Sequence, residues 1–282
     1  MITNEKHLLY ILKVKKGRLE YILEHLDNFY YSFSKPKINH ITGRISRKAN
    51  GEEVHRLINA PNEELKRIQK RIYKFIRAKV DLPSYIYGGV KGKNNIRNAR
   101  FHQGNKYIFT TDLKSFFPSI TYKQVFHMFL REGCTPSVAR ILTKLTTLHY
   151  SLPQGTPTSS LIANLVFKPY GEQIAEFASR NDMKFSMFVD DITISSKTDF
   201  KNLVPEILNI INRSGYRISH KKTHYQTKNP VITGVVCHNG KLLAPSVYKK
   251  KLARLRKEQE EKSEPSNHLR GLENYIHSIE MA

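Results

Sequence analysis

The sequence contains little that would support a secreted, disulfide-bonded or membrane-spanning protein. Its two cysteines, Cys134 and Cys237, lie far apart without a paired spacing, so we expect neither a disulfide framework nor a zinc site, and a reducing cytoplasm fits. No uninterrupted apolar run approaches the roughly 18 residues that a membrane span needs. Residues 1–16 are too charged, with too short an apolar part, for a secretory signal. Internal repeats and low-complexity tracts are absent as well.

Acidic residues are also scarce: 24 Asp and Glu face 47 Lys and Arg among 282 residues, which gives a net charge of +23. A protein this basic repels itself, so a polyanionic partner is expected, with nucleic acid ahead of an anionic membrane surface. The hydrophobic fraction of 39% and the aromatic fraction of 10% exclude wholesale disorder. The length allows one large globular unit or two modest ones.

Two neighbouring carboxylates, Asp190 and Asp191, stand in the middle of the stretch KFSMFVDDITISS at residues 184–196. Aromatic and β-branched residues on both sides predict two strands, with Asp-Asp at the tight turn between them. Like charges held at the edge of a core repel each other unless a cation lies between them. The stretch alone leaves two interpretations open, a divalent-metal site and an ordinary turn.

Two further segments carry candidate residues. Residues 106–120, KYIFTTDLKSFFPSI, predict a buried strand that ends at Asp112, which is a cap or turn residue unless it meets Asp190 and Asp191. Residues 152–160, LPQGTPTSS, predict a Pro- and Gly-rich turn before a helix. The free N–H groups of such a helix suit either a simple cap or a ligand, and Gln154 is suited to reach a planar or phosphorylated partner.

The remaining pattern is a mixture of helices, short strands and basic loops. A Gly- and Asn-rich loop at residues 80–105 is either an ordinary basic loop or a grip for phosphates. Residues 32–51 predict an irregular segment or a loose hairpin, and a turn is predicted at Asn239-Gly240. The tail from Ser246 is helical with a basic face that is either solvated or bound to RNA. Helices are predicted at residues 5–31 in two pieces around Gly17, from an Asn62 cap to Lys79, at 121–131, at 136–148, from about Thr158 and at 199–214, and a strand at 54–61.

Taken in order, Asp112 with Phe117, LPQGTPTSS at 152–160 and FVDD at 188–191 resemble the palm of a reverse transcriptase of the bacterial retron and group II intron lineage. The resemblance covers roughly residues 50–280. Phe188 stands where retron enzymes have tyrosine, a departure that concerns the subfamily and leaves the carboxylates intact. Shorter elements that are similar to those of the family are VHRLINAP at 54–61, YGGVKGK at 87–93, NARFH at 98–102, GYRISHKKT at 215–223 and Ile232-Thr233-Gly234.

The resemblance implies an α+β right-hand polymerase fold. Fingers and N-terminal helices would occupy residues 1–105. A palm of antiparallel sheet packed on helices would occupy 106–243, with some fingers helices inserted at about 121–150, and a short helical thumb 244–282. It also implies an RNA-directed DNA polymerase that copies a structured noncoding RNA into DNA, as retrons make msDNA, in antiphage defence and with an effector protein. The expected partners are that RNA as template and primer, dNTPs and the RNA–DNA hybrid, and no membrane is expected.

Nucleotide addition by in-line displacement of pyrophosphate needs hard oxygen ligands for two Mg²⁺ ions, or Mn²⁺ in their place. The resemblance implies Asp112, Asp190 and Asp191 as ligands, with the Leu113 carbonyl added, and Lys222 as the acid that protonates pyrophosphate. Phe117 would exclude a 2′-hydroxyl. The implied nucleotide-binding residues are Arg56, Lys91, Lys93, Arg97, Phe116, Phe117, Gln154 and Gly155. The implied RNA-binding residues are Asn98, His102, Thr233, Gly234, Lys249, Lys250, Arg254 and Arg256.

Two other functions stay open at this level. One is an RNA-binding scaffold that keeps a polymerase fold without its catalytic activity. The loss of a carboxylate would have favoured this function. The other is a protein-primed or untemplated DNA-synthesising enzyme.

Overall fold

The computed structural model describes residues 2–38, 43–48, 50–238, 240–262 and 267–282. The chain forms two compact units that interleave along the sequence. The first comprises residues 1–36, 55–84 and 114–172, and the second comprises 37–54, 85–113 and 173–282. No helix in the described part of the chain has the length and hydropathy of a membrane span.

The first unit is mainly helical, because its apolar residues recur at helical spacing and form one buried layer. Asn62 caps α3 as predicted, since its side-chain oxygen accepts a hydrogen bond from the Leu65 N–H at 3.0 Å. The break near the N-terminus falls at Lys13, whose φ is 49°, and not at Gly17, which lies inside α2. The helices are α1 (Glu5–Leu12), α2 (Lys16–Glu24), η1 (Leu26–Phe29), α3 (Glu63–Lys79), α5 (Phe116–Ser119), α6 (Tyr122–Arg131), α7 (Pro136–Thr146) and the first part of α8 (Ser159–Arg180).

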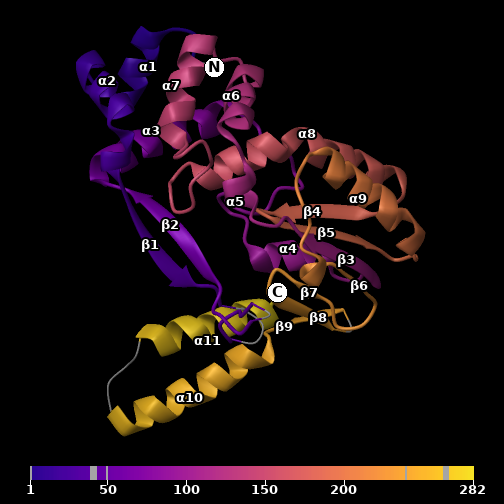
Figure 1. The fold of residues 1–282 in the computed structure, drawn as a ribbon. Coiled ribbons are helices and arrows are strands. Elements are labelled where there is room, and N and C mark those ends of the chain that lie inside the picture. The colour runs from indigo at the N-terminus through magenta and orange to yellow at the C-terminus, as the bar shows by residue number, and fades with distance from the viewer. Residues whose placement is uncertain (1, 39–42, 49, 239, 263–266) are drawn as a thin grey trace. The chain divides into compact units, whose positions relative to one another are not determined.

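A two-stranded hairpin extends from this helical layer (Figure 1). It consists of β1 (Tyr30–Pro36) and β2 (His55–Pro61). β2 was predicted as a strand, whereas β1 falls where the sequence predicted a helix to residue 31 and then an irregular segment or a loose hairpin. The strands pair antiparallel from Tyr30 opposite Pro61 to Pro36 opposite His55. The other edge of β2 is also paired, because the Asn59 N–H donates to the Gln154 carbonyl at 2.8 Å.

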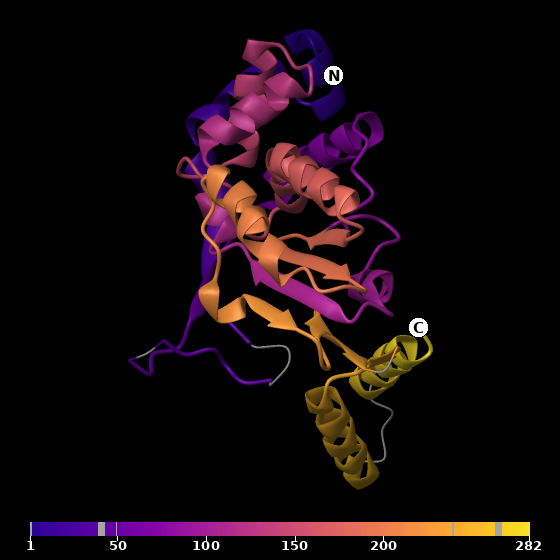
Figure 2. The ribbon, with the colours of Figure 1, turned by 90° about the vertical axis from the view of Figure 1, so that its right-hand side faces the viewer.

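The second unit is built on a four-stranded antiparallel sheet in the order β4-β5-β3-β6. Side chains alternate across it, so Ile192 and Ile194 point to one face and Thr193 and Ser195 to the other. Helix α9 lies over one face of the sheet, and α4, whose His102 bonds Ser195, lies over the other (Figures 1 and 2). The elements are α4 (Asn95–His102), β3 (Tyr107–Asp112), β4 (Lys184–Phe188), β5 (Asp191–Ser196), η2 (Lys201–Leu203), α9 (Val204–Arg213), η3 (His220–Lys222) and β6 (His224–Gln226).

A second small sheet and two C-terminal helices complete this unit. The strands β7 (Val231–Ile232), β8 (Val235–His238) and β9 (Lys241–Leu243) pair in sequence order, and α10 (Ser246–Lys262) and α11 (Asn267–Glu280) follow. β8 and β9 pair as predicted, with His238 opposite Lys241, although Asn239 of the predicted turn lies outside the described residues. A shared apolar core joins α4, the start of β3, this small sheet and α11.

Candidate active site

Three predicted carboxylates meet at one end of the four-stranded sheet. Asp112 ends β3 and lies directly opposite Asp191, the first residue of β5. Asp190 belongs to the two-residue loop Val189-Asp190, since Phe188 pairs with Asp191 across it. The Leu113 N–H donates to the Asp190 carbonyl at 2.9 Å, which ties this loop to the end of β3. The turn residues are therefore Val189 and Asp190 rather than Asp-Asp, and Asp191 is a strand residue.

The loop carries backbone strain at Val189, whose φ is 61°. A positive φ is rare for a β-branched residue, and in hairpin loops of this length glycine normally takes such a position. The segment before α4 supports the loop: Met187 donates its N–H to the Tyr85 carbonyl at 2.8 Å and accepts from the Tyr87 N–H at 2.8 Å. Strain of this kind persists where the surrounding structure holds the backbone, and it is frequent at functional sites.

The electrostatics of the cluster are those of a site that lacks enough positive charge. Burial and then the charge of Asp190 raise the pKa of Asp191 to about 7. The Lys222 ammonium donates to Oδ1 of Asp112, whose side chain is only 7% exposed. Desolvation lowers the pKa of Lys222, but its hydrogen bond to Asp112 and the three carboxylate charges outweigh this, so the net shift is upward.

The donor set fits a divalent cation. In the described part of the chain, no group of three or more His, Cys, Asp or Glu side chains is already arranged to hold a metal ion. The three aspartates nevertheless supply the hard oxygens that Mg²⁺ prefers, and the pKa of Asp191 is raised first by burial and then by the charge of Asp190. Lys222 provides positive charge at Asp112, where an ion would otherwise do so.

The first unit holds five of the predicted nucleotide-binding residues, Arg56, Phe116, Phe117, Gln154 and Gly155. Gln154 and Gly155 lie at the edge of β2 that does not face β1, and a β-carbon built on Gly155 would lie 2.6 Å from Cγ2 of Ile58. Arg56, two residues earlier on β2, is exposed. Phe117 is half-buried, whereas Phe116 is 2% exposed and packs edge-on against another ring of the core. The Phe116 ring therefore supports the core in this arrangement.

The predicted phosphate grip of residues 80–105 contains helix α4, which the sequence did not predict. Lys91 and Arg97 are exposed, and Arg97 donates to the Gly92 carbonyl. Lys93 donates to the Ile86 carbonyl at 2.8 Å, and its ammonium lies 4.5 Å from the centre of the Tyr87 ring. The ammonium of Lys93 is thus turned toward its own segment in this conformation.

Two of the predicted RNA-binding residues are buried. Asn98 and His102 are 0% exposed, so a direct contact of either side chain with RNA is not supported. The two ring nitrogens of His102 lie 2.7 Å from Oγ of Ser186 and Oγ of Ser195, on neighbouring strands of the sheet. Asn98 donates to the Thr233 hydroxyl at 3.3 Å. These residues fix α4 against both sheets, a role that the spacing of NARFH did not reveal.

Thr233 and Gly234 form the loop between β7 and β8, and both have positive φ, 46° and 82°. Such a pair is typical of a type I′ hairpin turn. Helix α4 holds the loop, because Asn95 donates its side-chain N–H to the Thr233 carbonyl at 3.2 Å and to the Tyr275 hydroxyl at 2.7 Å. The NARFH and Ile-Thr-Gly elements, 130 residues apart in sequence, therefore form one hydrogen-bonded assembly with α11.

The buried imidazole of His102 gives a testable pH dependence of stability. Burial, with a smaller effect of the Lys184 charge, lowers the pKa of His102 to about 3. Below pH 6.5 the unfolded chain takes a proton on this residue and the folded chain does not, so we expect the free energy of unfolding to fall by about 1.4 kcal/mol per pH unit. The free energy of unfolding, measured in urea, should fall between pH 7.5 and pH 5.0 by about 2 kcal/mol less in His102→Gln than in the parent protein. An equal difference in both proteins would contradict a neutral buried imidazole.

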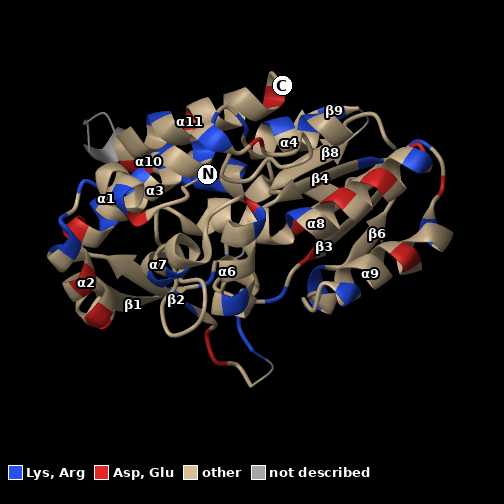
Figure 3. Ribbon diagram, turned by 90° about the horizontal axis from the view of Figure 1, so that it is seen from above, with Lys and Arg blue, Asp and Glu red and all other residues tan. Residues whose placement is uncertain are grey.

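Glutamates offset the cations on the basic face of α10, and two of the three glutamates lie on α11. Lys249 pairs with Glu280 at 2.7 Å, Arg254 with Glu258 at 2.7 Å, and Arg256 with Glu273 at 2.8 Å. All these pairs are solvent-exposed, and such pairs contribute little to stability, so phosphates can replace the glutamates. Lys250 is exposed. The overall excess of Lys and Arg is spread over many elements of the chain (Figure 3).

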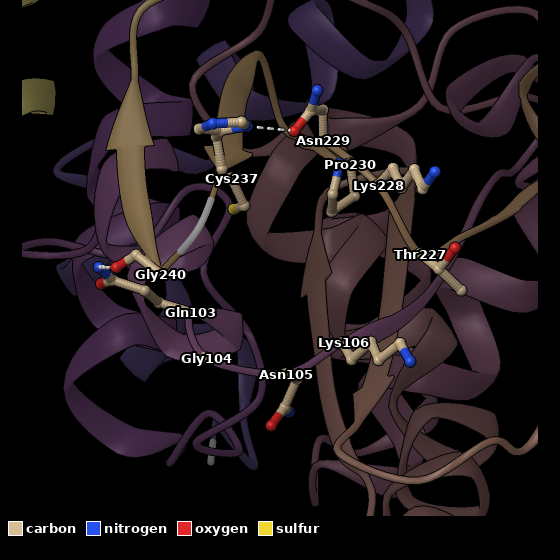
Figure 4. A pocket seen from close by; sticks show the side chains of 11 residues that line it. Gln103, Gly104, Asn105, Lys106, Thr227, Lys228, Asn229, Pro230, Cys237 and Gly240 are labelled. Carbon is tan, nitrogen blue, oxygen red and sulfur yellow. Dashed lines mark hydrogen bonds between the residues drawn. The ribbon is translucent and has the colours of Figure 1, made fainter.

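A pocket of about 440 Å³ lies in the second unit, away from the carboxylates (Figure 4). Residues 103–106 line it at the start of β3, whereas Asp112 ends that strand, about 17 Å away at the usual rise per residue. Burial raises the pKa of Cys237 in its wall to about 11, so this thiol is protonated at neutral pH. The pocket is not part of the carboxylate site.

The sequence is similar to those of known proteins. The family model described as reverse transcriptase (RNA-dependent DNA polymerase) matches residues 46–262. The retron Se72 reverse transcriptase of Salmonella heidelberg is 31% identical over 219 residues, which are 76% of this chain and 55% of that protein. Two Escherichia coli proteins are similar. The retron Ec86 reverse transcriptase is 29% identical over 83% of this chain and 74% of its own, and the retron Ec83 enzyme 28% over 88% and 86%.

Proposed function

Because the chain belongs to the reverse transcriptase family, whose members are RNA-dependent DNA polymerases, we propose that it copies RNA into DNA at the cluster of Asp112, Asp190 and Asp191. The observation that carries the proposal is the meeting of these side chains, 78 residues apart in sequence, at the end of one sheet. The matching of Asp112 to Asp191 across two central strands gives them the rigid platform that the chemistry needs.

Each group of the cluster has a proposed task. Asp112, Asp190, Asp191 and the Leu113 carbonyl would hold two divalent ions, Mg²⁺ or Mn²⁺, which when bound would stabilise the attacking and leaving oxygens. The aspartates orient the reacting groups, and the strained loop keeps Asp190 beside the end of β3. Lys222, whose pKa is raised, would give a proton to the leaving pyrophosphate.

The right-hand assignment is part of the same proposal. The four-stranded sheet would be the palm within residues 106–243, the hairpin β1–β2 with residues 1–105 the fingers, and α10 with α11 in residues 244–282 the thumb. Lys91, Lys93, Arg97 and Arg56 would bind the triphosphate, with Gln154 and Gly155 under the base. The free thiols Cys134 and Cys237 fit a cytoplasmic enzyme.

The template would be a structured noncoding RNA that also primes synthesis, because the three relatives described above are retron enzymes by name. The exposed cations of α10 and the Thr233-Gly234 loop are the proposed RNA contacts. By likeness to those relatives, the proposal extends to msDNA as the product. It also extends to a role in antiphage defence together with an effector protein. Charge and shape would dominate on an A-form hybrid, whose major groove is too narrow to read.

The direct test is DNA synthesis by the purified chain. Protein that is isolated with its neighbouring RNA should extend DNA when it is given Mg²⁺ and dNTPs, and sequencing should show a copy of that RNA. Products that form equally well when single dNTPs are omitted would indicate untemplated addition. If the protein makes no DNA on either the cognate RNA or a primed homopolymer, the proposal is rejected.

Phe117 is the proposed steric gate against ribonucleotides. Replacing Phe117 with Ala should raise incorporation of rNTP relative to dNTP by about tenfold or more, because removal of the ring opens space for a 2′-hydroxyl. The ratio is measured by single-nucleotide extension with each substrate. Phe116→Leu, at the neighbouring buried ring, is the control and should leave the ratio unchanged. The gate lies elsewhere if Phe117→Ala also leaves it unchanged.

A further inference from the structure

A pair of hydroxyl groups joins the four-stranded sheet to the turn η3, which carries Lys222. Thr111 is the residue of β3 before Asp112, and Thr223 directly follows Lys222. Their side-chain oxygens are 2.8 Å apart, although the two residues are 112 positions apart in sequence. The sequence analysis assigned no function to either threonine.

Thr111 occupies a position that favours an apolar residue. It pairs with Ile192 across the sheet, so it lies on the same face as Phe109 and Ile194, which are both buried. Thr111 is itself only 2% exposed. Burying a hydroxyl on an apolar face is unfavourable unless the hydroxyl forms a hydrogen bond, and Thr223 supplies that bond.

The direction of this bond follows from the second contact of Thr223. The Thr223 hydroxyl donates to the Ser219 carbonyl at 3.0 Å, and because a hydroxyl has one proton, it accepts from Thr111. The Ser219 carbonyl also accepts from the Lys222 N–H at 2.8 Å, and the Ser219 N–H donates to the Asp112 carbonyl at 2.7 Å. Both ends of η3 are therefore bonded to β3, through Ser219 before the turn and through Thr223 after it.

These bonds determine from where the Lys222 side chain starts. A lysine side chain has a flexible four-carbon stem, so the place of its ammonium depends on the backbone that carries it. The ammonium of Lys222 donates to Oδ1 of Asp112, and the side chain is 44% exposed, so packing does little to hold it. Such a group needs a fixed backbone, because a displacement of about 1 Å at a reacting group lowers the rate about a hundredfold.

We propose that Thr111 and Thr223 are positioning residues, which hold the Lys222 ammonium at the carboxylate cluster for proton transfer to pyrophosphate. The inference rests on the proposed function, since Lys222 has this task only if nucleotides are added there. In that step the primer hydroxyl gives its proton to water, its oxygen bonds to the α-phosphorus, and the bond from that phosphorus to the bridging oxygen breaks. The bridging oxygen leaves with pyrophosphate and takes the proton of Lys222, which water restores. The two threonines act on this step only through Lys222.

The test removes the hydroxyl and keeps the shape of the side chain. In primer extension over a range of dNTP concentrations, Thr223→Val should lower kcat about tenfold and leave the KM for dNTP nearly unchanged. The loss should be smaller than that for a 1 Å displacement, because the Ser219 contact still holds the other end of η3. Thr111→Val should have the same effect. Thr223→Ser, which keeps the hydroxyl, should retain the kcat of the parent protein.

Lys222→Met distinguishes positioning of Lys222 from general support of the fold. Methionine keeps a long side chain but has no proton to give, so Thr223→Val should lower kcat no further in this background. A tenfold loss in both backgrounds would overturn the proposal, because the effect would not pass through Lys222. Thr143→Val is the matched control. It removes a buried hydroxyl that donates to the Ala139 carbonyl at 2.7 Å in the first unit, and it should keep the kcat of the parent protein.

Melting temperatures test the hydroxyl pair whether or not DNA is made. Thr111→Val or Thr223→Val alone takes the partner from the other hydroxyl and should lower Tm, whereas the double variant leaves neither hydroxyl and should recover part of that loss. The expected result is recovery of Tm without recovery of kcat. Additive losses of Tm, or full kcat in Thr223→Val, would overturn the proposal. A parent protein that makes no DNA would instead reject the proposed function and with it the task of Lys222, and the melting temperatures would still decide the pairing.

Discussion

Asp190→Asn combined with Asp191→Asn should reduce DNA synthesis at least a thousandfold while RNA remains bound. Both carboxylates lie at the end of β5 beside Asp112, and without them the site lacks the anionic oxygens that hold divalent ions. Stabilisation of the reacting oxygens by such ions accounts for several kcal/mol of the barrier, and each 1.4 kcal/mol is a factor of ten in rate. The measurement is single-turnover primer extension, with a parallel filter-binding assay for RNA.

The stability of this double variant distinguishes loss of chemistry from loss of the fold. Burial and the neighbouring Asp190 charge raise the pKa of Asp191, so removing both charges relieves repulsion and should keep or increase the melting temperature. Asp182→Asn, an exposed aspartate just before β4, is the control and should leave both activity and stability unchanged. Undiminished synthesis by the double variant would place the active site elsewhere. A parent protein that binds RNA but makes no DNA would favour the RNA-binding scaffold without catalytic activity.

Sequence patterns were sufficient where the local signal and the tertiary structure agree. The strand that ends at Asp112, the two strands around the aspartates and the helix capped by Asn62 are present as predicted. In each, apolar periodicity coincides with a turn or capping residue, so burial and local preference favour the same conformation. The three carboxylates were expected to meet only through the resemblance, since no periodic pattern records which strands are neighbours.

Other features depend on contacts that a linear pattern does not contain. β1 is almost entirely exposed, and it is a strand because β2 pairs with it residue by residue. Helix α4 is short and basic, and its Asn98 and His102 satisfy partners more than 80 residues away. Gly88 belongs to the loop at residues 80–105, which the sequence left open as an ordinary basic loop or a grip for phosphates. Its closest neighbour is the loop that carries Asp190. The sequence of residues 87–93 alone does not show whether a phosphate or this loop lies next to Gly88.

That proximity makes Gly88→Ala the substitution outside the carboxylates with the largest expected effect. A β-carbon on Gly88 would lie 2.6 Å from Cγ2 of Val189 and 2.8 Å from the carbonyl carbon of Phe188, and still closer to the Val189 nitrogen. Backbone atoms cannot rotate away as a side-chain tip can, so the Val189-Asp190 loop must move. A displacement of about 1 Å at a reacting group lowers the rate about a hundredfold. We expect kcat for nucleotide addition to fall by that factor, with the KM for dNTP and the RNA affinity nearly unchanged.

A second substitution shows whether the loss arises at the loop. Val189→Gly removes the methyl contact and relieves the strain of a β-branched residue at φ 61°, so Gly88→Ala with Val189→Gly should recover part of the lost kcat. Gly17→Ala is the matched control, because nothing lies within 4 Å of a β-carbon at that helical position, and it should keep full activity. Full activity of Gly88→Ala would show that the loop tolerates the shift. A fall in RNA affinity equal to the fall in kcat would show instead that Gly88 supports the fold and does not specifically position Asp190.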